Sequence, residues 1–305
     1  MDFNLAPLKY RNILATSGGP LERITVEQAG PQEELRYEAV AYLVPSLVPE
    51  WHKKSSIYSG GHGGGTHKLR NVACHIAISE ALERWAFLQT LYGPAASQYG
   101  FDIEPSTSGM AAFPGFTSET ARMRADWEAV ERWALLAWWE GRLSAAERPD
   151  SDKNEGAISL SLPFKDKNAV VLWRALPGGN MAYGFAAADS EETALEKASV
   201  ELGRNIVALN QFYGDRGADV RQFIADVELP VYERRLIFFS TAEGYEVFRA
   251  RISSSTARMV APREATKLID REITGPWSRY ATVWRTLYTQ GAEHLDKARH
   301  DIFLF

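Results

Sequence analysis

The sequence is poor in cysteine, has no long apolar run and carries no excess of positive charge. Its single cysteine, Cys74, excludes an internal disulfide framework and fits a reducing compartment. No uninterrupted apolar stretch reaches the length of a membrane span, and the first residues lack the pattern of a secretory signal. The formal net charge of −5 argues against a surface built for nucleic acid. We therefore expect a cytoplasmic protein without membrane or nucleic-acid partners.

A helix over residues 72–88 is expected to be the element around which the chain is organised. Its apolar residues recur at helical spacing in two rows, so it is apolar nearly all round and should be buried. Glu80 and Glu83 continue one of these rows, and Arg84 follows them. Because an unpaired buried carboxylate is costly, such acids are usually paired or bound to a metal ion.

The string E-A-[LV]-E-R-W-A occurs twice, and its second copy contains Glu128, Glu131 and Arg132 within an apolar helix. Two carboxylates three residues apart share one helix face and are close enough to hold a hard cation such as Mg²⁺. The alternative is that Glu80 pairs with Arg84, and Glu128 with Arg132, as i, i+4 salt bridges on solvated faces. The apolar surroundings, present in both copies, favour inward acids over solvated salt bridges.

A third helix is expected after Asp189, which would cap it, with Glu192 in the capping-box position. Its row of small residues leads from Ala198 to Glu201, and Arg204 lies nearby. Three helices with inward acids indicate one shared site.

The remaining segments predict an α+β protein with antiparallel sheets, formed as one domain over residues 1–305 with an exposed connector at 148–156. A strand and turn are expected over residues 9–30, and further strands are expected over 37–44, 169–176, 181–186, 234–239, 245–252 and 282–288.

The glycine-rich segment 59–68 immediately precedes the organising helix and is interpreted as a loop. A flexible connection and a phosphate cradle at the helix N-terminus both explain it. The nearby histidines His62, His67 and His75 raise the possibility of zinc, but they lack a compact ligand spacing.

Taken together, these motifs resemble the YcaO superfamily of ATP- and Mg²⁺-dependent enzymes that activate a peptide backbone amide. The matching pieces are A-x-x-x-A-x-x-E-x-x-E-R from Ala73, S-G-x-A-A from Ser108, E-x-x-E-R from Glu128 and A-x-x-x-A-x-x-E from Ala194. The resemblance departs at Gly61-His62-Gly63, where the family commonly has Gly-Lys-Gly, and at Trp133, where it often has an acid.

The resemblance implies a YcaO-like fold whose buried helices converge on a Mg-ATP site. The residues that would hold Mg²⁺ are Glu80, Glu83, Glu128, Glu131 and Glu201. The further residues that would bind the nucleotide or its phosphates are Lys9, Ser17, Arg84, Ser106, Ser108, Arg132 and Arg204. The implied partners are a peptide or protein substrate, a second copy of the chain in a homodimer, and a second protein that delivers substrate or sulfur.

Three functions remain open at this point: an amide-activating enzyme, a nucleotide-binding scaffold of a modifying complex, and a Mg-nucleotide enzyme acting on a small molecule. Azoline-forming members of the family commonly end in a proline-rich tail, whereas no proline follows Pro276 here. The last residues are instead apolar, so we expect them to pack on the domain or on a partner subunit. The missing tail favours an external nucleophile such as sulfide, and hence a thioamide product over an azoline.

Overall fold

A computed structural model describes residues 3–29, 36–49, 57, 62–152, 154–216, 220–226, 229–256, 265–289, 293–296 and 298–305. The chain divides into two compact units, which are treated separately below. Unit 1 comprises Met1–Lys53, Ser59–Ala129 and Lys267–Leu287. Unit 2 comprises Lys54–Tyr58, Val130–Thr266 and Tyr288–Phe305.

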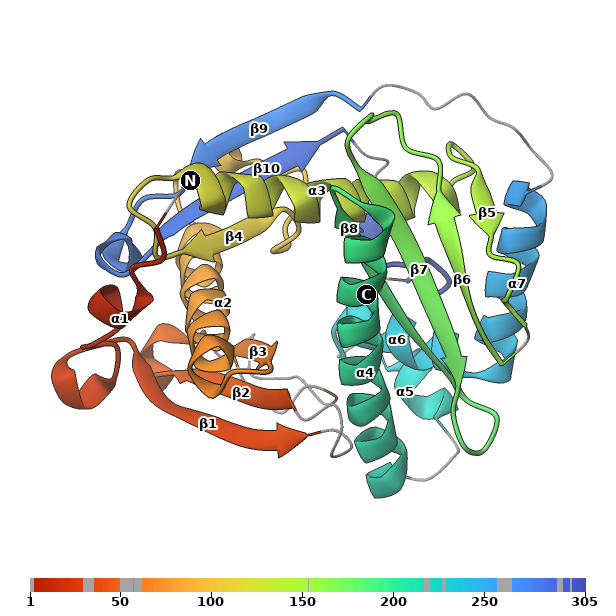
Figure 1. Ribbon diagram of the computed structural model, residues 1–305, viewed down its shortest axis with the longest axis horizontal. Coiled ribbons are helices and arrows are strands. Elements are labelled where there is room, and N and C mark those ends of the chain that lie inside the picture. Colours follow the sequence, from red (N-terminus) through yellow and green to blue (C-terminus); the bar gives the residue numbers. More distant parts are fainter. Residues whose placement is uncertain are drawn as a thin grey trace. The chain divides into compact units, whose positions relative to one another are not determined.

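Unit 1 contains two three-stranded sheets, ordered β1-β2-β3 and β4-β10-β9. Their strands are β1 (Leu21–Ala29), β2 (Arg36–Leu43), β3 (Gly63–His67), β4 (Met110–Phe113), β9 (Lys267–Glu272) and β10 (Thr282–Tyr288, whose last residue belongs to unit 2). The helical elements are α1 (Ala6–Lys9), η1 (Ala15–Ser17), η3 (Pro45–Leu47), α2 (Arg70–Thr90), η5 (Ala96–Tyr99) and η6 (Pro276–Arg279). The longest of these, α2, packs on β2 and β3 (Figure 1).

Unit 2 is built on an antiparallel sheet ordered β5-β6-β7-β8. Its strands are β5 (Ala145–Glu147), β6 (Glu155–Leu160), β7 (Asn168–Ala175) and β8 (Met181–Ala188). Its helical elements are α4 (Glu191–Arg216), α5 (Arg221–Ala225), α6 (Val231–Ser240), α7 (Ala242–Thr256) and η7 (Glu293–Leu295). Helix α4 lies along β7 and β8 (Figure 1). The helix α3 (Glu119–Trp139) contributes residues to both units, because the boundary falls after Ala129.

The mixture of helices with antiparallel sheets confirms the α+β class expected from the sequence. The helix expected over residues 72–88 corresponds to α2, and the apolar helix expected around the second copy of the repeated string corresponds to α3. The strands expected over residues 169–176 and 181–186 correspond to β7 and β8, which pair as an antiparallel hairpin. Among the residues that the structure describes, no helix is long and apolar enough to cross a membrane.

Two segments expected to be strands are helices instead, because a short apolar run alone does not distinguish the two structures. The segment 234–239 lies in α6, where every residue from Glu233 to Ser240 is buried, so no periodicity is visible. The segment 245–252 lies in α7, where Phe248 and Ile252 are 0% and 1% exposed. Their spacing of four residues is a helical signal that the strand interpretation overlooked.

The segment 9–30 and the N-terminus of α4 also differ from expectation. Lys9 ends α1, so the early strand is wrong, although β1 occupies the later part of that segment. Helix α4 is capped by Ser190, whose Oγ accepts a hydrogen bond from the Thr193 N–H at 3.2 Å, so the cap predicted at Asp189 is wrong by one residue. A hydroxyl at the N-cap satisfies one of the N–H groups that a helix leaves without an internal partner.

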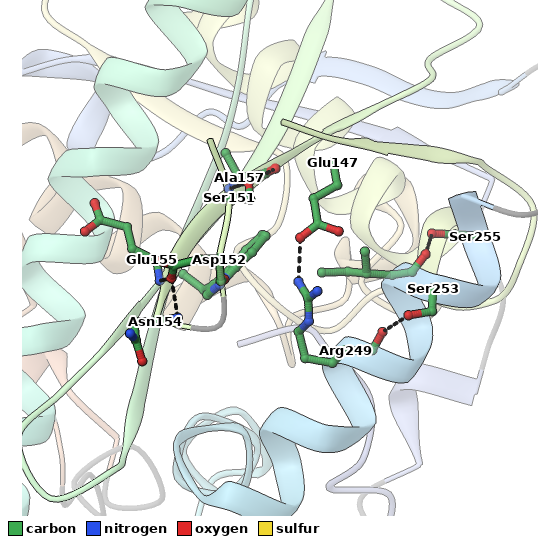
Figure 2. A network of polar contacts seen from close by, with 11 residues as sticks. Glu147, Ser151, Asp152, Asn154, Glu155, Ala157, Arg249, Ser253 and Ser255 are labelled. Atoms are coloured by element: carbon green, nitrogen blue, oxygen red, sulfur yellow. Dashed lines mark hydrogen bonds and ion pairs between the residues drawn. The ribbon is translucent and has the colours of Figure 1, made fainter. Parts of the chain in front are cut away.

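The polar segment expected as an exposed connector at 148–156 joins β5 to β6 within unit 2 (Figure 2). Asp152 accepts hydrogen bonds from the backbone N–H groups of Asn154 and Glu155, which forms an Asx-type turn. Ser151 exchanges two hydrogen bonds with the backbone of Ala157. The described residues of this segment therefore form the turn of the β5–β6 hairpin.

Strand β3 explains much of the glycine-rich segment, which was expected to be a loop; residues 59–61 lie outside the described part of the chain. A Cβ atom at Gly63 or Gly65 would lie 2.1 Å from a backbone carbonyl oxygen of α2, that of Ala77 or Ala73 respectively. The absence of a side chain at these positions thus allows the strand to lie directly on the helix.

This close approach predicts that an alanine substitution lowers the free energy of unfolding much more at Gly65 than at the neighbouring Gly64. Gly65→Ala is expected to lower the free energy of unfolding by roughly 1–3 kcal/mol, because helix and strand must separate to accommodate the methyl group. Gly64→Ala is the matched control, since the nearest atom to its Cβ is Glu80 Oε2 at 3.8 Å, an ordinary contact. Urea melts of both variants measure the difference, and equal midpoints would contradict this account of the β3–α2 contact.

Candidate functional site

The site in unit 1 begins with Glu80, which α2 places beside β3. The row of small residues on α2, Ala73 and Ala77, faces the glycines of β3, and Glu80 follows one turn later. The half-buried carboxylate of Glu80 accepts a hydrogen bond from the Gly64 N–H at 3.0 Å. The strand therefore fixes the orientation of the first carboxylate through its backbone.

Glu83 lies one turn further along α2, and four charged side chains act on its carboxyl. Burial raises the pKa of the Glu83 carboxyl well above its usual range, and the neighbouring carboxylates of Glu128 and Glu80 raise it further. The positive charges of Arg84 and Arg285 oppose these effects. Acids from both copies of the repeated string therefore interact electrostatically in unit 1, two from α2 and one from α3. Such a group of carboxylates is more stable when a cation shares it.

Arg285 of β10 is completely buried, and its positive charge acts on the carboxyl of Glu83. Its guanidinium donates to the carbonyl oxygens of Tyr99 (2.7 Å), Glu104 (2.6 Å), Ser106 (2.8 Å) and Ser108 (3.2 Å). Burial lowers its pKa to about 10, while the negative charges of Glu104, Glu128 and Glu83 act in the opposite direction. The side chain remains positively charged at neutral pH.

The loop held by Arg285 contains Ser106 and Ser108, two of the expected nucleotide contacts. The Ser106 hydroxyl donates to Ser108 Oγ at 3.0 Å and accepts from the Ser108 N–H at 3.1 Å. Both side chains are half-buried. At Gly109, φ is +72°, and a Cβ would lie 2.0 Å from the Thr286 carbonyl oxygen, so the chain needs glycine where the loop enters β4.

The remaining residues expected in the unit 1 site are Lys9 and Ser17. Lys9 Nζ donates to the Gly115 carbonyl oxygen at 2.8 Å, which uses one of the three N–H donors of a lysine ammonium. Ser17 ends the short helix η1 and is exposed. Both residues belong to unit 1, as do Glu80, Glu83 and Glu128.

A second acid group lies in unit 2 around Glu131. Burial raises the pKa of the Glu131 carboxyl to about 7; Arg132 opposes this shift and Glu201 adds to it. A hydrogen bond from the Ala187 backbone and the charge of Lys197 also favour the ionised form. A buried carboxyl that titrates near neutrality is typical of functional sites, although ion-pair networks also produce such shifts.

Arg132 and Arg204 have partners within unit 2. Arg132 Nη1 donates to the Phe305 main-chain oxygen at 2.9 Å, and its Nε lies 3.8 Å from Glu131 Oε1. Arg204 forms an ion pair with Glu201 at 2.7 Å, and the exposed fractions of their side chains are 31% and 45%. This pair is a solvated i, i+3 salt bridge of the kind that contributes a few tenths of a kcal/mol.

The donor set fits Mg²⁺ better than zinc. No group of three or more His, Cys, Asp or Glu side chains within the described residues is arranged to hold a metal ion. Zinc requires about four such ligands, whereas Mg²⁺ is commonly held by one or two carboxylates together with water and substrate phosphates. His62 and His67 instead accept hydrogen bonds at Nδ1 from the backbone N–H groups of Leu43 and Leu69. The side chains of Glu80, Glu83 and Glu128 offer carboxylate oxygens, the ligand type that Mg²⁺ prefers.

Comparisons of the chain with protein-family models, with curated proteins and with solved structures find no match. The assignment of function therefore rests on the chemistry of the two acid groups and on the sequence motifs.

Arg285 is the residue of the unit 1 site that reasoning from the sequence missed. The signal was present: in the segment Val283-Trp284-Arg285-Thr286-Leu287, the arginine stands at the same strand phase as the fully buried Val283 and the buried Leu287. Side chains two residues apart on a strand share a face. A charge on the buried face of a strand has the same diagnostic value as an acid on the buried face of a helix.

Proposed function

We propose that this protein is an ATP- and Mg²⁺-dependent enzyme that activates a backbone amide of a peptide or protein by O-phosphorylation. The main support is Glu83, whose carboxyl interacts electrostatically with the carboxylates of Glu80 and Glu128 and with the positive charges of Arg84 and Arg285. A metal-bound polyphosphate carries both signs of charge, so it would neutralise such a mixed set of acids and arginines. The doubled E-x-x-E-R motif and the S-G-x-A-A segment support the same function.

The proposal gives each group of side chains a role. Glu80, Glu83 and Glu128 of unit 1 and Glu131 and Glu201 of unit 2 would hold Mg²⁺. Arg84, Arg132 and Arg204 would bind phosphate oxygens, together with Lys9 and Ser17, while Ser106 and Ser108 would contact the nucleotide. Bound Mg-ATP would supply the phosphoryl group and the charge that offsets the carboxylates. The protein would contribute mainly positioning and electrostatic stabilisation.

The reaction that fits these groups has two steps. The substrate amide oxygen bonds to the terminal phosphorus with release of ADP, and an external nucleophile such as sulfide then displaces phosphate at the amide carbon. The product would be a thioamide, and the former amide oxygen would leave as part of inorganic phosphate. A second protein that delivers substrate or sulfur and a homodimeric state remain parts of this proposal.

Nucleotide binding is tested by thermal unfolding. Mg-ATP is expected to raise the melting temperature, since a ligand at a hundredfold excess over its Kd stabilises the folded state by about 2.7 kcal/mol. ATP with EDTA should have a much smaller effect, because the acids would then face the phosphates without a cation. Mg²⁺ alone is the control for simple charge neutralisation. A melting curve that is insensitive to both nucleotide conditions would refute the nucleotide site.

The type of product is tested by mass spectrometry of a modified peptide. Exchange of oxygen for sulfur raises the peptide mass, whereas azoline formation removes water and lowers it. We expect the increase, and only in the presence of a sulfide source. Water loss without added sulfur would show that a side chain of the substrate is the nucleophile, and nucleotide hydrolysis that leaves every peptide unchanged would favour a small-molecule substrate.

A further inference from the structure

Arg285 forms an unusually large number of contacts with one loop. Four carbonyl oxygens between Tyr99 and Ser108 accept hydrogen bonds from its guanidinium, and its Cζ lies 4.1 Å from the centroid of the Phe101 ring. The planar fork of an arginine can bind several acceptors in a fixed arrangement, which the single ammonium of a lysine cannot reproduce. The conformation of the loop therefore depends on this one side chain.

The same guanidinium also lies close to the acid group. Its charge acts on Glu83, and the charges of Glu83 and Glu128 act on it in return. Burial of a guanidinium that serves only to hold a loop is costly, because its charge must be removed from water. The neighbouring carboxylates reduce this cost, and the arginine in turn favours their ionised state.

We infer that Arg285 is a positioning residue that fixes the loop carrying Ser106 and Ser108 in register with the carboxylates of Glu83 and Glu128. This inference rests on the proposed function, in which the two serines contact the nucleotide and the two acids hold the metal ion. Arg285 itself directs its donors to loop carbonyls, so it acts through the loop. Loss of the fork is expected to impair nucleotide recognition more than it impairs the fold.

The variant Arg285→Lys separates the charge from the fork. It retains a positive charge near Glu83 and Glu128 but cannot bridge the four carbonyls. Arg251→Lys in unit 2 is the matched control, since Arg251 also donates to a backbone carbonyl oxygen, that of Trp138, and has no place in the proposed site. Both substitutions weaken guanidinium–carbonyl bonds, so a general loss of stability would affect both.

Two measurements on the full chain decide the inference. Hydrogen exchange without nucleotide should show faster exchange of the amides of residues 101–110 in Arg285→Lys, with no change there in Arg251→Lys. The KM for ATP should rise on the order of tenfold in Arg285→Lys and stay unchanged in the control, because misplaced binding groups reduce the capture of substrate. If Arg285→Lys fails to fold, Phe101→Leu removes the ring beside the guanidinium and should shift both measurements in the same direction.

The outcomes distinguish this inference from the function on which it rests. A wild-type protein that neither binds nor hydrolyses ATP would refute the proposed function, while the exchange measurement would still report on the loop. Faster loop exchange with an unchanged KM in an ATP-hydrolysing protein would overturn the inference and leave Arg285 a structural residue. Equal behaviour of Arg285→Lys and Arg251→Lys in both measurements would overturn it as well.

Discussion

Glu83→Gln is expected to yield a protein at least as stable as the wild type whose ATP-dependent turnover is reduced on the order of 10²-fold or more. Gln retains the size of Glu and resembles its protonated form, which the buried environment and the adjacent carboxylates of Glu128 and Glu80 favour. The substitution removes a charge that burial and the neighbouring carboxylates disfavour but that bound Mg²⁺ requires. Stability and activity should therefore change in opposite directions.

The experiment compares urea melts with ATP hydrolysis rates. Glu196→Gln, an exposed acid on α4, is the control and should change neither quantity. If Glu83 instead served to neutralise Arg84, the Gln variant would leave this half-buried arginine without its charge partner. Such a loss costs on the order of 3 kcal/mol, so strong destabilisation with intact hydrolysis would establish the structural role.

The effect of Glu131→Gln on the free energy of unfolding should depend on pH, because it arises from the protonation state of the Glu131 carboxyl. Because the pKa of Glu131 is raised to about 7 in the folded protein, the folded state binds its proton more tightly than the unfolded state does. The stability that this proton provides is present at low pH and is lost as pH rises through about 7. Relative to wild type, the Gln variant should thus gain stability between pH 5 and pH 8, on the order of 2 kcal/mol. A difference that is the same at both pH values would contradict the shift.

The helices that carry the acids could be predicted from the sequence because their apolar residues recur over many turns. Glu80 and Glu83 stand in an otherwise apolar row of α2, so periodicity alone placed them near the core. The sequence did not predict that the acids form two separate groups, one in each unit. Glu83 interacts with Glu128 in unit 1, whereas Glu131 interacts with Glu201 in unit 2. That arrangement depends on how each helix packs on its own sheet, which local spacing does not encode.

Other features were missed because the deciding interactions join distant parts of the chain. The role of Gly63 and Gly65 depends on the backbone of α2, so a glycine-rich strand could not be distinguished from a loop. The burial of Arg285 depends on carbonyl groups about 180 residues earlier in the chain. Single-sequence patterns report the period of an element but not which backbone atoms will face a particular side chain.

The apolar segment at residues 302–305 was expected to pack on the domain or on a partner, and it packs within unit 2. Phe303 is completely buried, and its ring lies 5.0 Å, centroid to centroid, from those of Phe239 and Phe248. The rings of Trp138 and Tyr183 lie 5.9 and 5.1 Å away in edge-to-face arrangements. Such geometry is favourable for aromatic pairs in addition to the burial of their surface.

Phe303→Ala is therefore expected to lower the free energy of unfolding by about 3–5 kcal/mol, the usual effect of removing a buried aromatic ring. Phe303→Leu should cost less, since it fills more of the cavity, and Phe3→Ala, at a residue 72% exposed, should have little effect. Phe303→Ala should also weaken the hydrogen bond that Arg132 donates to the main-chain oxygen of Phe305, because Phe305 follows Phe303 by only two residues. Chemical denaturation of the three variants measures the stabilities. If Phe303→Ala unfolds at the same denaturant concentration as Phe3→Ala, packing of the Phe303 ring contributes nothing to stability. The contact between Arg132 and Phe305 would then not depend on that packing.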